Sequence, residues 1–227
     1  MTTLRKLIPA LDCDLEQALE LVAKVDQVDS VYGYKVGFVL GLAHGLPKVV
    51  KELRRLSSKP LIYDHQKAGT DIPDTGEAFA HTLGKAGIDE AILFPQAGPE
   101  TLAGWTRALQ KERLKVVVGG VMTHPRYLAS EGGFLVDERI MGAYAAAAQQ
   151  GVRAFVVPMT KPAVVKAIAD SLGPGDWEFY SPGLGAQGGS LAGFDFLKRH
   201  YAIIGRSLLK ASDPAQYLGA VLKGEAK

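Results

Sequence analysis

The chain has 227 residues, of which 47% are hydrophobic and 22% charged, a balance typical of a soluble globular protein. Its net charge of +2 argues against a nucleic-acid or membrane-surface protein, since both usually carry a concentrated basic excess. The single cysteine, Cys13, cannot form an internal disulfide. No apolar run approaches the ~18 residues that a membrane span needs. We therefore expect a cytoplasmic protein with neither nucleic-acid nor membrane partners.

Short apolar runs alternate along the chain with longer amphipathic stretches. The apolar runs predict strands at residues 7–12, 31–38, 60–64, 90–94, 115–119, 154–158, 178–181 and 201–205. Helical patterns lie between them at 15–26, 45–57, 75–86, 99–111, 139–150, 161–171 and 213–222. The connection 182–198 contains too many glycines to predict a long helix. This order of elements predicts a parallel sheet with crossover helices.

Eight strands with intervening helices indicate a closed (β/α)₈ barrel, the TIM-barrel fold. An open, doubly wound sheet is the alternative, but no glycine-rich turn follows the first predicted strand. The composition shows no break or Ser/Gly linker, so residues 1–227 are predicted to form a single domain. The connection 123–137 is long, and long loops at the carboxyl ends of barrel strands are usually functional.

Charged residues stand inside or just after the predicted strands, where an unpaired charge would be costly to bury. The first strand ends in Asp12, the second contains Lys35, and the third runs into Asp64, Lys67 and Asp71. Active sites of these barrels lie at the carboxyl ends of the strands, so the five side chains are expected to gather there. A structural ion pair would explain any one of them equally well. The five together favour a catalytic cluster.

Two neighbouring strand ends predict a phosphate site. The glycine-rich segment 182–189, which reads PGLGAQGG, follows the seventh strand, and Gly205-Arg206 follows the eighth. Loops after strands seven and eight are the recurrent phosphate site of this fold, and arginine can bind phosphate through two parallel hydrogen bonds. The alternative is a flexible turn next to a surface cation, but the pairing of the two segments favours phosphate binding.

In this order, the segments resemble the orotidine 5'-phosphate decarboxylase family over essentially the whole chain. The matching pieces are Ala10-Leu11-Asp12, Lys35-Val36-Gly37, Asp64…Lys67…Asp71-Ile72-Pro73-Asp74-Thr75, Met122-Thr123-His124-Pro125, residues 181–189 and Ile204-Gly205-Arg206. The glycine-rich piece is similar to the archaeal-type members of the family.

The resemblance implies decarboxylation of orotidine 5'-monophosphate to uridine 5'-monophosphate, a step of pyrimidine biosynthesis. Asp64 and Lys67 would flank the reacting carbon, and Lys67 would stabilise and protonate the C6 carbanion. Lys35 would reach the ribose and the charged cluster. The resemblance also implies a homodimer with shared sites, in which Asp71 and Thr75 are offered to the partner subunit. Substrate contacts are implied for Asp12, Thr75, Thr123, Pro182, Gly183, Gln187, Gly205 and Arg206.

The charged cluster departs from the family pattern, in which Asp-x-Lys-x-x-Asp is usual. Here Asp64, Lys67 and Asp71 are spaced three and four residues apart. Residues three apart on a regular strand face opposite sides, so the chain would have to bulge or leave the strand early for Asp64 and Lys67 to converge.

Two other functions fit parts of the pattern. A metal-dependent sugar-phosphate lyase or decarboxylase of the same superfamily would need an additional acidic ligand, and no glutamate stands convincingly at a strand end. His65 and His124 lack a third ligand at metal spacing. We therefore expect neither a metal nor another cofactor. A non-catalytic nucleotide-binding barrel would keep only the phosphate site.

Overall fold

The computed structural model describes residues 3–65, 70–185 and 187–225. These residues form one eight-stranded sheet, and every pair of neighbouring strands in it runs parallel. The strands are β1 (Leu4–Pro9), β2 (Tyr34–Gly37), β3 (Leu61–Asp64), β4 (Glu90–Leu93), β5 (Lys115–Gly119), β6 (Ala154–Val156), β7 (Glu178–Ser181) and β8 (Arg199–Ile204). The sheet order β1-β8-β7-β6-β5-β4-β3-β2 follows the chain around a ring.

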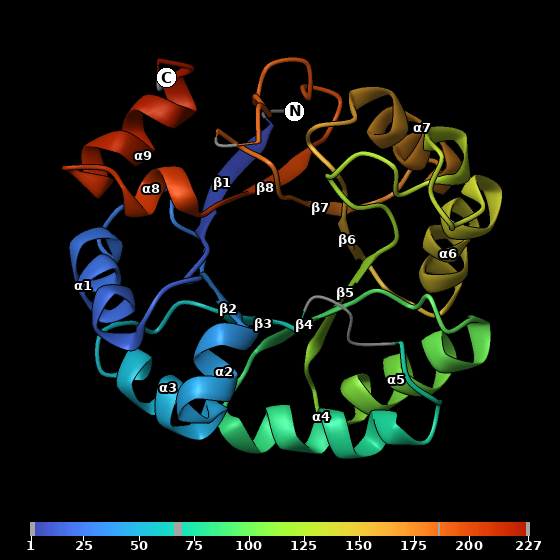
Figure 1. The fold of residues 1–227 in the computed structure, drawn as a ribbon, viewed down its shortest axis with the longest axis horizontal. Helices are drawn as coiled ribbons and strands as arrows, with labels where there is room; N and C mark the ends of the chain where they lie inside the picture. The colour runs from blue at the N-terminus through green and yellow to red at the C-terminus, as the bar shows by residue number, and fades with distance from the viewer. Residues whose placement is uncertain (1–2, 66–69, 186, 226–227) are drawn as a thin grey trace.

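Helices surround the sheet, as the view along its axis shows (Figure 1). They are α1 (Leu15–Val25), α2 (Phe38–His44), α3 (Leu46–Arg54), α4 (Thr75–Ala86), α5 (Pro99–Lys111), α6 (Asp137–Gln149), α7 (Pro162–Leu172), α8 (Arg206–Leu209) and α9 (Pro214–Lys223), with a short 3₁₀ turn, η1, at Ala129–Glu131. No helix in the described part of the chain is both long enough and apolar enough to cross a bilayer.

The sheet closes between its first and last members. The first strand pairs with β8 over a continuous register from Leu4↔Arg199 to Pro9↔Ile204. On its other side, the segment of β1 meets the segment of β2 through isolated bridges at Leu7↔Val31 and Ala10↔Lys35. This nearly closed parallel ring confirms the predicted (β/α)₈ barrel.

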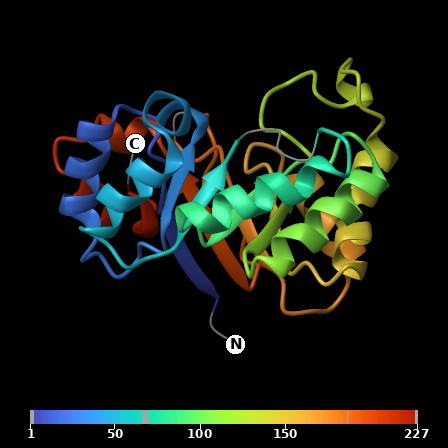
Figure 2. The ribbon, with the colours of Figure 1, turned by 90° about the horizontal axis from the view of Figure 1, so that it is seen from below.

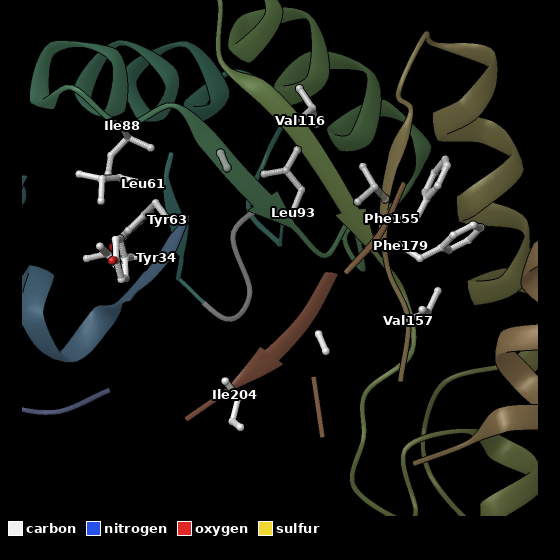
Figure 3. Packing of buried hydrophobic residues seen from close by; sticks show 14 of the residues in the cluster. Tyr34, Leu61, Tyr63, Ile88, Leu93, Val116, Phe155, Val157, Phe179 and Ile204 are labelled. Carbon is white, nitrogen blue, oxygen red and sulfur yellow. The ribbon is translucent and has the colours of Figure 1, made fainter. Parts of the chain in front are cut away.

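Side chains on the outer face of the sheet form a large apolar layer beneath the helices. Figure 3 shows members of this layer, including Leu61 on β3, Val116 on β5 and Phe155 on β6. Phe155 is fully buried and packs near Trp177 and Phe179. Burial of apolar surface contributes roughly 25 cal/mol per Å² to folding, so this layer holds the helices against the barrel.

The inner face alternates with the outer one, because successive side chains on a strand point to opposite faces. Ile8, Ile62, Val117 and Ala154 fill the middle of the barrel. At the amino-terminal ends of the strands a polar network closes the interior. It consists of Tyr32, Glu90, Lys115, Glu178 and Tyr180.

In this network the Tyr180 hydroxyl donates to Glu90 at 2.8 Å and accepts from Lys115 Nζ at 2.9 Å. Burial raises the pKa of the Glu90 carboxyl, although Lys115 lowers it in part. The network satisfies groups that would otherwise be buried without partners, and it forms the floor of the barrel.

The strands and most helices lie where the sequence predicts them, with shifts of a few residues at their ends. The pattern at 45–57 corresponds to α3, but α2 was not expected: the predicted second strand continues to Phe38, where this helix begins. The helix has the sequence FVLGLAH, in which only Leu40 is buried. Because apolar residues also stand on its exposed sides, the sequence shows no apolar stripe at helical spacing.

Candidate active site

A cavity lies at the carboxyl ends of the strands, on the side opposite the polar floor. Nine of the side chains or glycines predicted for the site line it: Asp12, Lys35, Asp64, Thr123, Pro182, Gly183, Gln187, Gly205 and Arg206. Figure 2 shows the barrel from the side, with the start of β1 at one end and the long segment between β5 and α6 rising at the other. The predicted site residues that line it therefore share one cavity at this end of the strands.

Lys35 is the buried cation of this cavity. Its Nζ lies 3.1 Å from Asp12 Oδ1 and 3.2 Å from Asp64 Oδ2, so three neighbouring strands contribute one charge cluster. Burial alone would lower the pKa of Lys35, but the carboxylates of Asp64 and Asp12 outweigh that effect and raise it. Lys35 is therefore protonated at neutral pH and balances part of the negative charge.

The backbone of β2 makes room for this cluster at Gly37. A β-carbon at that position would lie 2.5 Å from Asp12 Oδ1 and 3.8 Å from Lys35 Nζ. Any side chain there would displace the Asp12 carboxylate, which explains why a glycine follows Lys35 by two residues.

The phosphate-binding elements predicted from the sequence follow β7 and β8, next to β1 in the ring, and line the same cavity. After β7 the chain turns through Gly183, which has φ +110°, and Gly189 N–H donates to Gly183 O at 2.9 Å. Gly205 and the exposed Arg206 follow β8 and line the same cavity. Backbone N–H groups together with a guanidinium form an arrangement suited to a phosphate dianion.

Apolar residues from the remaining strands form the rest of the cavity wall. Ile92 and Phe94 come from β4 and its end, Val156 from β6 and Ile203 from β8. Phe94 is 5% exposed and belongs to the inner core. The sequence did not identify these residues, because an apolar residue on a strand is usually part of the core. Only the three-dimensional arrangement of the strands shows that these four line the cavity.

The end of β5 is held by two tyrosine hydroxyls. Tyr144 on α6 accepts from Gly120 N at 2.9 Å and Val121 N at 3.1 Å, and donates to Val156 O at 2.9 Å. Tyr127 donates to Gly120 O at 2.9 Å. Two residues after Val121, Thr123 O accepts from Thr160 Oγ1 at 2.8 Å. These bonds fix the stretch that brings Thr123 to the cavity.

Two predicted site residues do not line this cavity in their own chain. Asp71 is exposed, and its carboxylate accepts from Ile72 N at 2.7 Å. Thr75 begins α4 and donates to Ile72 O at 2.8 Å. Lys67 lies outside the described residues, so the consequence of the expanded spacing between Asp64 and Lys67 stays a prediction.

Metal binding was not expected from the sequence. Within residues 3–65, 70–185 and 187–225, the side chains of His, Cys, Asp and Glu form no group of three or more that could hold a metal ion. His65 contacts the Tyr63 hydroxyl through Nδ1, and the ring of His124 packs edge-on against Tyr127.

Similarity to known proteins agrees with this geometry. Residues 5–221 match the model of the orotidine 5'-phosphate decarboxylase / HUMPS family. A protein of Methanosarcina mazei named orotidine 5'-phosphate decarboxylase is 34% identical over 216 residues, which cover 92% of this chain and 90% of the relative. A relative of the same name from Methanococcoides burtonii is 34% identical over 214 residues, 93% of each chain.

A solved structure gives the same result in three dimensions. The orotidine 5'-monophosphate decarboxylase of Methanocaldococcus jannaschii, in complex with the inhibitor BMP, superposes with a TM-score of 0.83 at 29% identity and covers 99% of this chain and 100% of its own. The family model, the relatives and the structural likeness each extend over nearly the whole barrel. The chain belongs to the orotidine 5'-phosphate decarboxylase / HUMPS family.

Proposed function

We propose that this protein decarboxylates orotidine 5'-monophosphate to uridine 5'-monophosphate without a cofactor. The observation that carries the proposal is one cavity lined both by the Asp12–Lys35–Asp64 cluster and by Gln187, Gly205 and Arg206. Relatives that share at least 30% of their residues with this chain carry the name of that activity. The M. jannaschii enzyme binds the inhibitor BMP in the same fold.

The arrangement suits a reaction that builds negative charge on a ring carbon. Loss of CO₂ from the substrate leaves a carbanion with no adjacent electron sink, so stabilisation must come from fixed charges in a site shielded from water. Asp64 is 6% exposed and lies next to Lys35, which supports such a site. Lys67, three residues after Asp64, is assigned the role of ammonium group that stabilises the carbanion and then protonates it.

Binding of the distant phosphate supports the chemical step. Arg206 and the glycine turn at Gly183 line the same cavity as Asp64, from the ends of β8 and β7. Interaction with a non-reacting part of a substrate can be used to orient and desolvate the reacting part. Binding of the phosphate would thus hold the base against Asp64 while the carboxylate of the base departs as CO₂.

A homodimer with shared sites is part of the proposal. Asp71 and Ile72 are exposed just before α4, outside the cavity of their own chain. This supports a role for Asp71 and Thr75 in the cavity of a second subunit. A cytoplasmic location is also part of the proposal, and the single free cysteine fits it, because cytosolic thiols stay reduced.

The test is an ultraviolet absorbance assay for loss of orotidine 5'-monophosphate, run with and without chelator. We expect turnover that is unaffected by chelator and abolished in Lys67→Ala, because that variant lacks the proton donor. The exposed Lys223→Ala is the matched control and should retain full activity. Near-normal turnover by Lys67→Ala would overturn the role of the lysine.

The same assay separates the two alternatives. Activity that disappears with chelator would favour a metal-dependent lyase of the superfamily. Tight binding of uridine 5'-monophosphate without any turnover would favour a nucleotide-binding barrel that has no catalytic activity.

A further inference from the structure

The order of strands around the barrel places an aromatic residue across from the substrate-anchoring strands. In the ring, β4 and β5 lie opposite β8 and β1 (Figure 1). The cavity receives Arg206 after β8 and Asp12 after β1, whereas Phe94 follows β4. A ligand that spans the cavity from Arg206 toward Asp64 therefore meets Phe94 on the next strand beyond Asp64.

The ring of Phe94 occupies space that Gly119 leaves free. A β-carbon built on Gly119, the last residue of β5, would lie 2.4 Å from Phe94 Cζ, 2.7 Å from Cε2 and 2.9 Å from Cε1. Carbon atoms in contact normally lie about 3.5–4.0 Å apart, so the ring rests directly on the glycine backbone. Only a residue without a side chain permits this position.

We propose that Phe94, seated on Gly119, determines which substituents the base can carry on its reacting edge, the C5–C6 bond. The inference rests on the proposed function. Asp64 ends β3 and is placed beside the reacting carbon, and β3 pairs with β4 through Ile62↔Glu90 and Tyr63↔Ala91. Continued by one residue, this register sets Ile92 level with Asp64. Phe94 follows two residues later on the same inward face, nearer the mouth, so its ring would cover the C5–C6 edge from that side.

The apolar surroundings of the ring support this role. Phe94 clusters with Ile92, Val156 and Ile203 in the inner core. An apolar wall discriminates by size, since one additional methylene-sized group typically changes relative affinity by about 10–200-fold. A ligand with a larger group on this edge must displace the ring, and the Gly119 backbone prevents the ring from retreating.

Binding of two nucleotides, measured by calorimetry, tests the proposal: uridine 5'-monophosphate and its 5-bromo derivative. Phe94→Leu removes the ring atoms that face Gly119 and should improve the affinity for the bromo derivative relative to the parent by roughly tenfold or more. Gly119→Ala should change the ratio in the opposite direction, because the added methyl group pushes the ring into the cavity.

The double variant Gly119→Ala/Phe94→Leu distinguishes an effect that acts through the Phe94 ring from a general loss of structure in Gly119→Ala. Leucine lacks the ring atoms that clash with the new methyl group, so the double variant should bind the parent nucleotide more tightly than Gly119→Ala alone. Phe155→Leu is the control: it removes a fully buried ring from the outer face of β6, away from the cavity, and should leave the ratio unchanged.

The outcomes distinguish this inference from the proposed function. If the wild-type protein binds uridine 5'-monophosphate but Phe94→Leu leaves the affinity ratio within twofold of wild type, the assignment of Phe94 is overturned and the function stands. If Phe155→Leu changes the ratio as much as Phe94→Leu does, the effect is general loosening, which also overturns the assignment. Failure of the wild-type protein to bind either nucleotide contradicts the proposed function itself.

Discussion

Lys35 shows how this protein keeps a buried side chain charged. Its side chain is only 6% exposed, yet two carboxylates lie within 3.2 Å of its nitrogen. The Asp12 carboxylate is half exposed and the Asp64 carboxylate is buried, so the cluster reaches from solvent into the interior. A charge at that depth persists because its partners are close enough to offset the loss of hydration.

Arg206 is expected to act mainly on the phosphate. Replacement by alanine removes a charge-assisted, potentially bidentate contact, and such contacts contribute about 1.5–3 kcal/mol. We expect Arg206→Ala to weaken binding of uridine 5'-monophosphate by roughly 10–100-fold. The affinity for uridine, which has no phosphate, should stay the same. Equal affinity of the variant and the wild type for the nucleotide would refute this role.

His200 gives the protein a specific pH dependence of stability. Burial lowers the pKa of His200 to about 4, with a smaller effect from Arg5, against 6.5 for an unperturbed side chain. Between these values the unfolded chain binds a proton that the folded chain does not. The free energy of unfolding therefore falls as the pH decreases from 6.5 toward 4, by up to about 1.4 kcal/mol per pH unit.

Chemical denaturation at several pH values measures this effect. The range between pH 6.5 and 5.5 is the most informative, because ordinary carboxylates remain ionised there. His200→Gln removes the titrating group and should flatten the dependence in that range. His44→Gln, which changes an imidazole at the end of α2, is the control and should keep the wild-type slope. An identical slope in His200→Gln and the wild-type protein would contradict the assignment.

At the scale of elements, the end of β5 depends on a hydroxyl from a helix. Tyr144 is fully buried, and its oxygen serves three backbone groups at the ends of β5 and β6. Tyr144→Phe would leave the N–H groups of Gly120 and Val121 without their acceptor. We expect a loss of about 1–3 kcal/mol in the free energy of unfolding, together with weaker nucleotide binding through displacement of Thr123.

Tyr34→Phe serves as the comparison for this experiment. Its hydroxyl donates to Asp26 at 3.0 Å, at the opposite end of β2 from the cavity, so a loss of stability there should leave nucleotide affinity unchanged. Stability is read from denaturant titration and affinity from calorimetry. If Tyr144→Phe binds the nucleotide as tightly as Tyr34→Phe does, the hydroxyl has only a structural role.

The sequence predicts elements well where their period is clear. Helices such as α1 and α5 carry an apolar stripe at helical spacing, and the strands are short apolar runs bounded by polar turns. The helix α2 was not predicted, because Phe38 belongs to the predicted strand and the exposed Val39 and Leu42 obscure any apolar stripe after it. Their burial state depends on tertiary contacts, which local periodicity does not encode.

At the scale of the molecule, strand alternation was sufficient to predict the barrel, and the barrel then placed most of the site. Asp12, Lys35 and Asp64 are far apart in the chain but adjacent in the ring, so knowing the fold was enough to predict their meeting. The apolar wall could not be predicted in this way. The contact of Phe94 with Gly119 depends on side-chain packing between β4 and β5, which no spacing rule expresses.

A dimer with shared sites makes a prediction about mixed subunits. Lys67→Ala and Asp71→Ala should each be inactive alone. If Asp71 acts in the partner's cavity, a mixed dimer contains one intact site and one site with both defects. Refolding or co-expressing the two variants in equal amounts should then restore about a quarter of the wild-type activity.

Light scattering would first establish that the wild-type protein and both variants are dimers. Two variants that each change a group in the same subunit's cavity, Lys67→Ala and Asp64→Ala, supply the control mixture and should restore no activity. No recovery in the mixture of Lys67→Ala and Asp71→Ala would place Asp71 in the site of its own chain or outside both.

The polar floor of the barrel has a consequence for how substrate enters the cavity and how products leave it. Tyr32, Tyr180, Glu90 and Lys115 close the amino-terminal end by hydrogen bonds among themselves, so the interior has no rear exit through them. A substrate that enters the cavity at the carboxyl ends of the strands must therefore leave, as product, through the same opening. Under the proposed function, CO₂ released deep in the cavity would be held behind the larger uridine 5'-monophosphate. The order in which the two products leave would then determine how often CO₂ can recombine with the nucleotide.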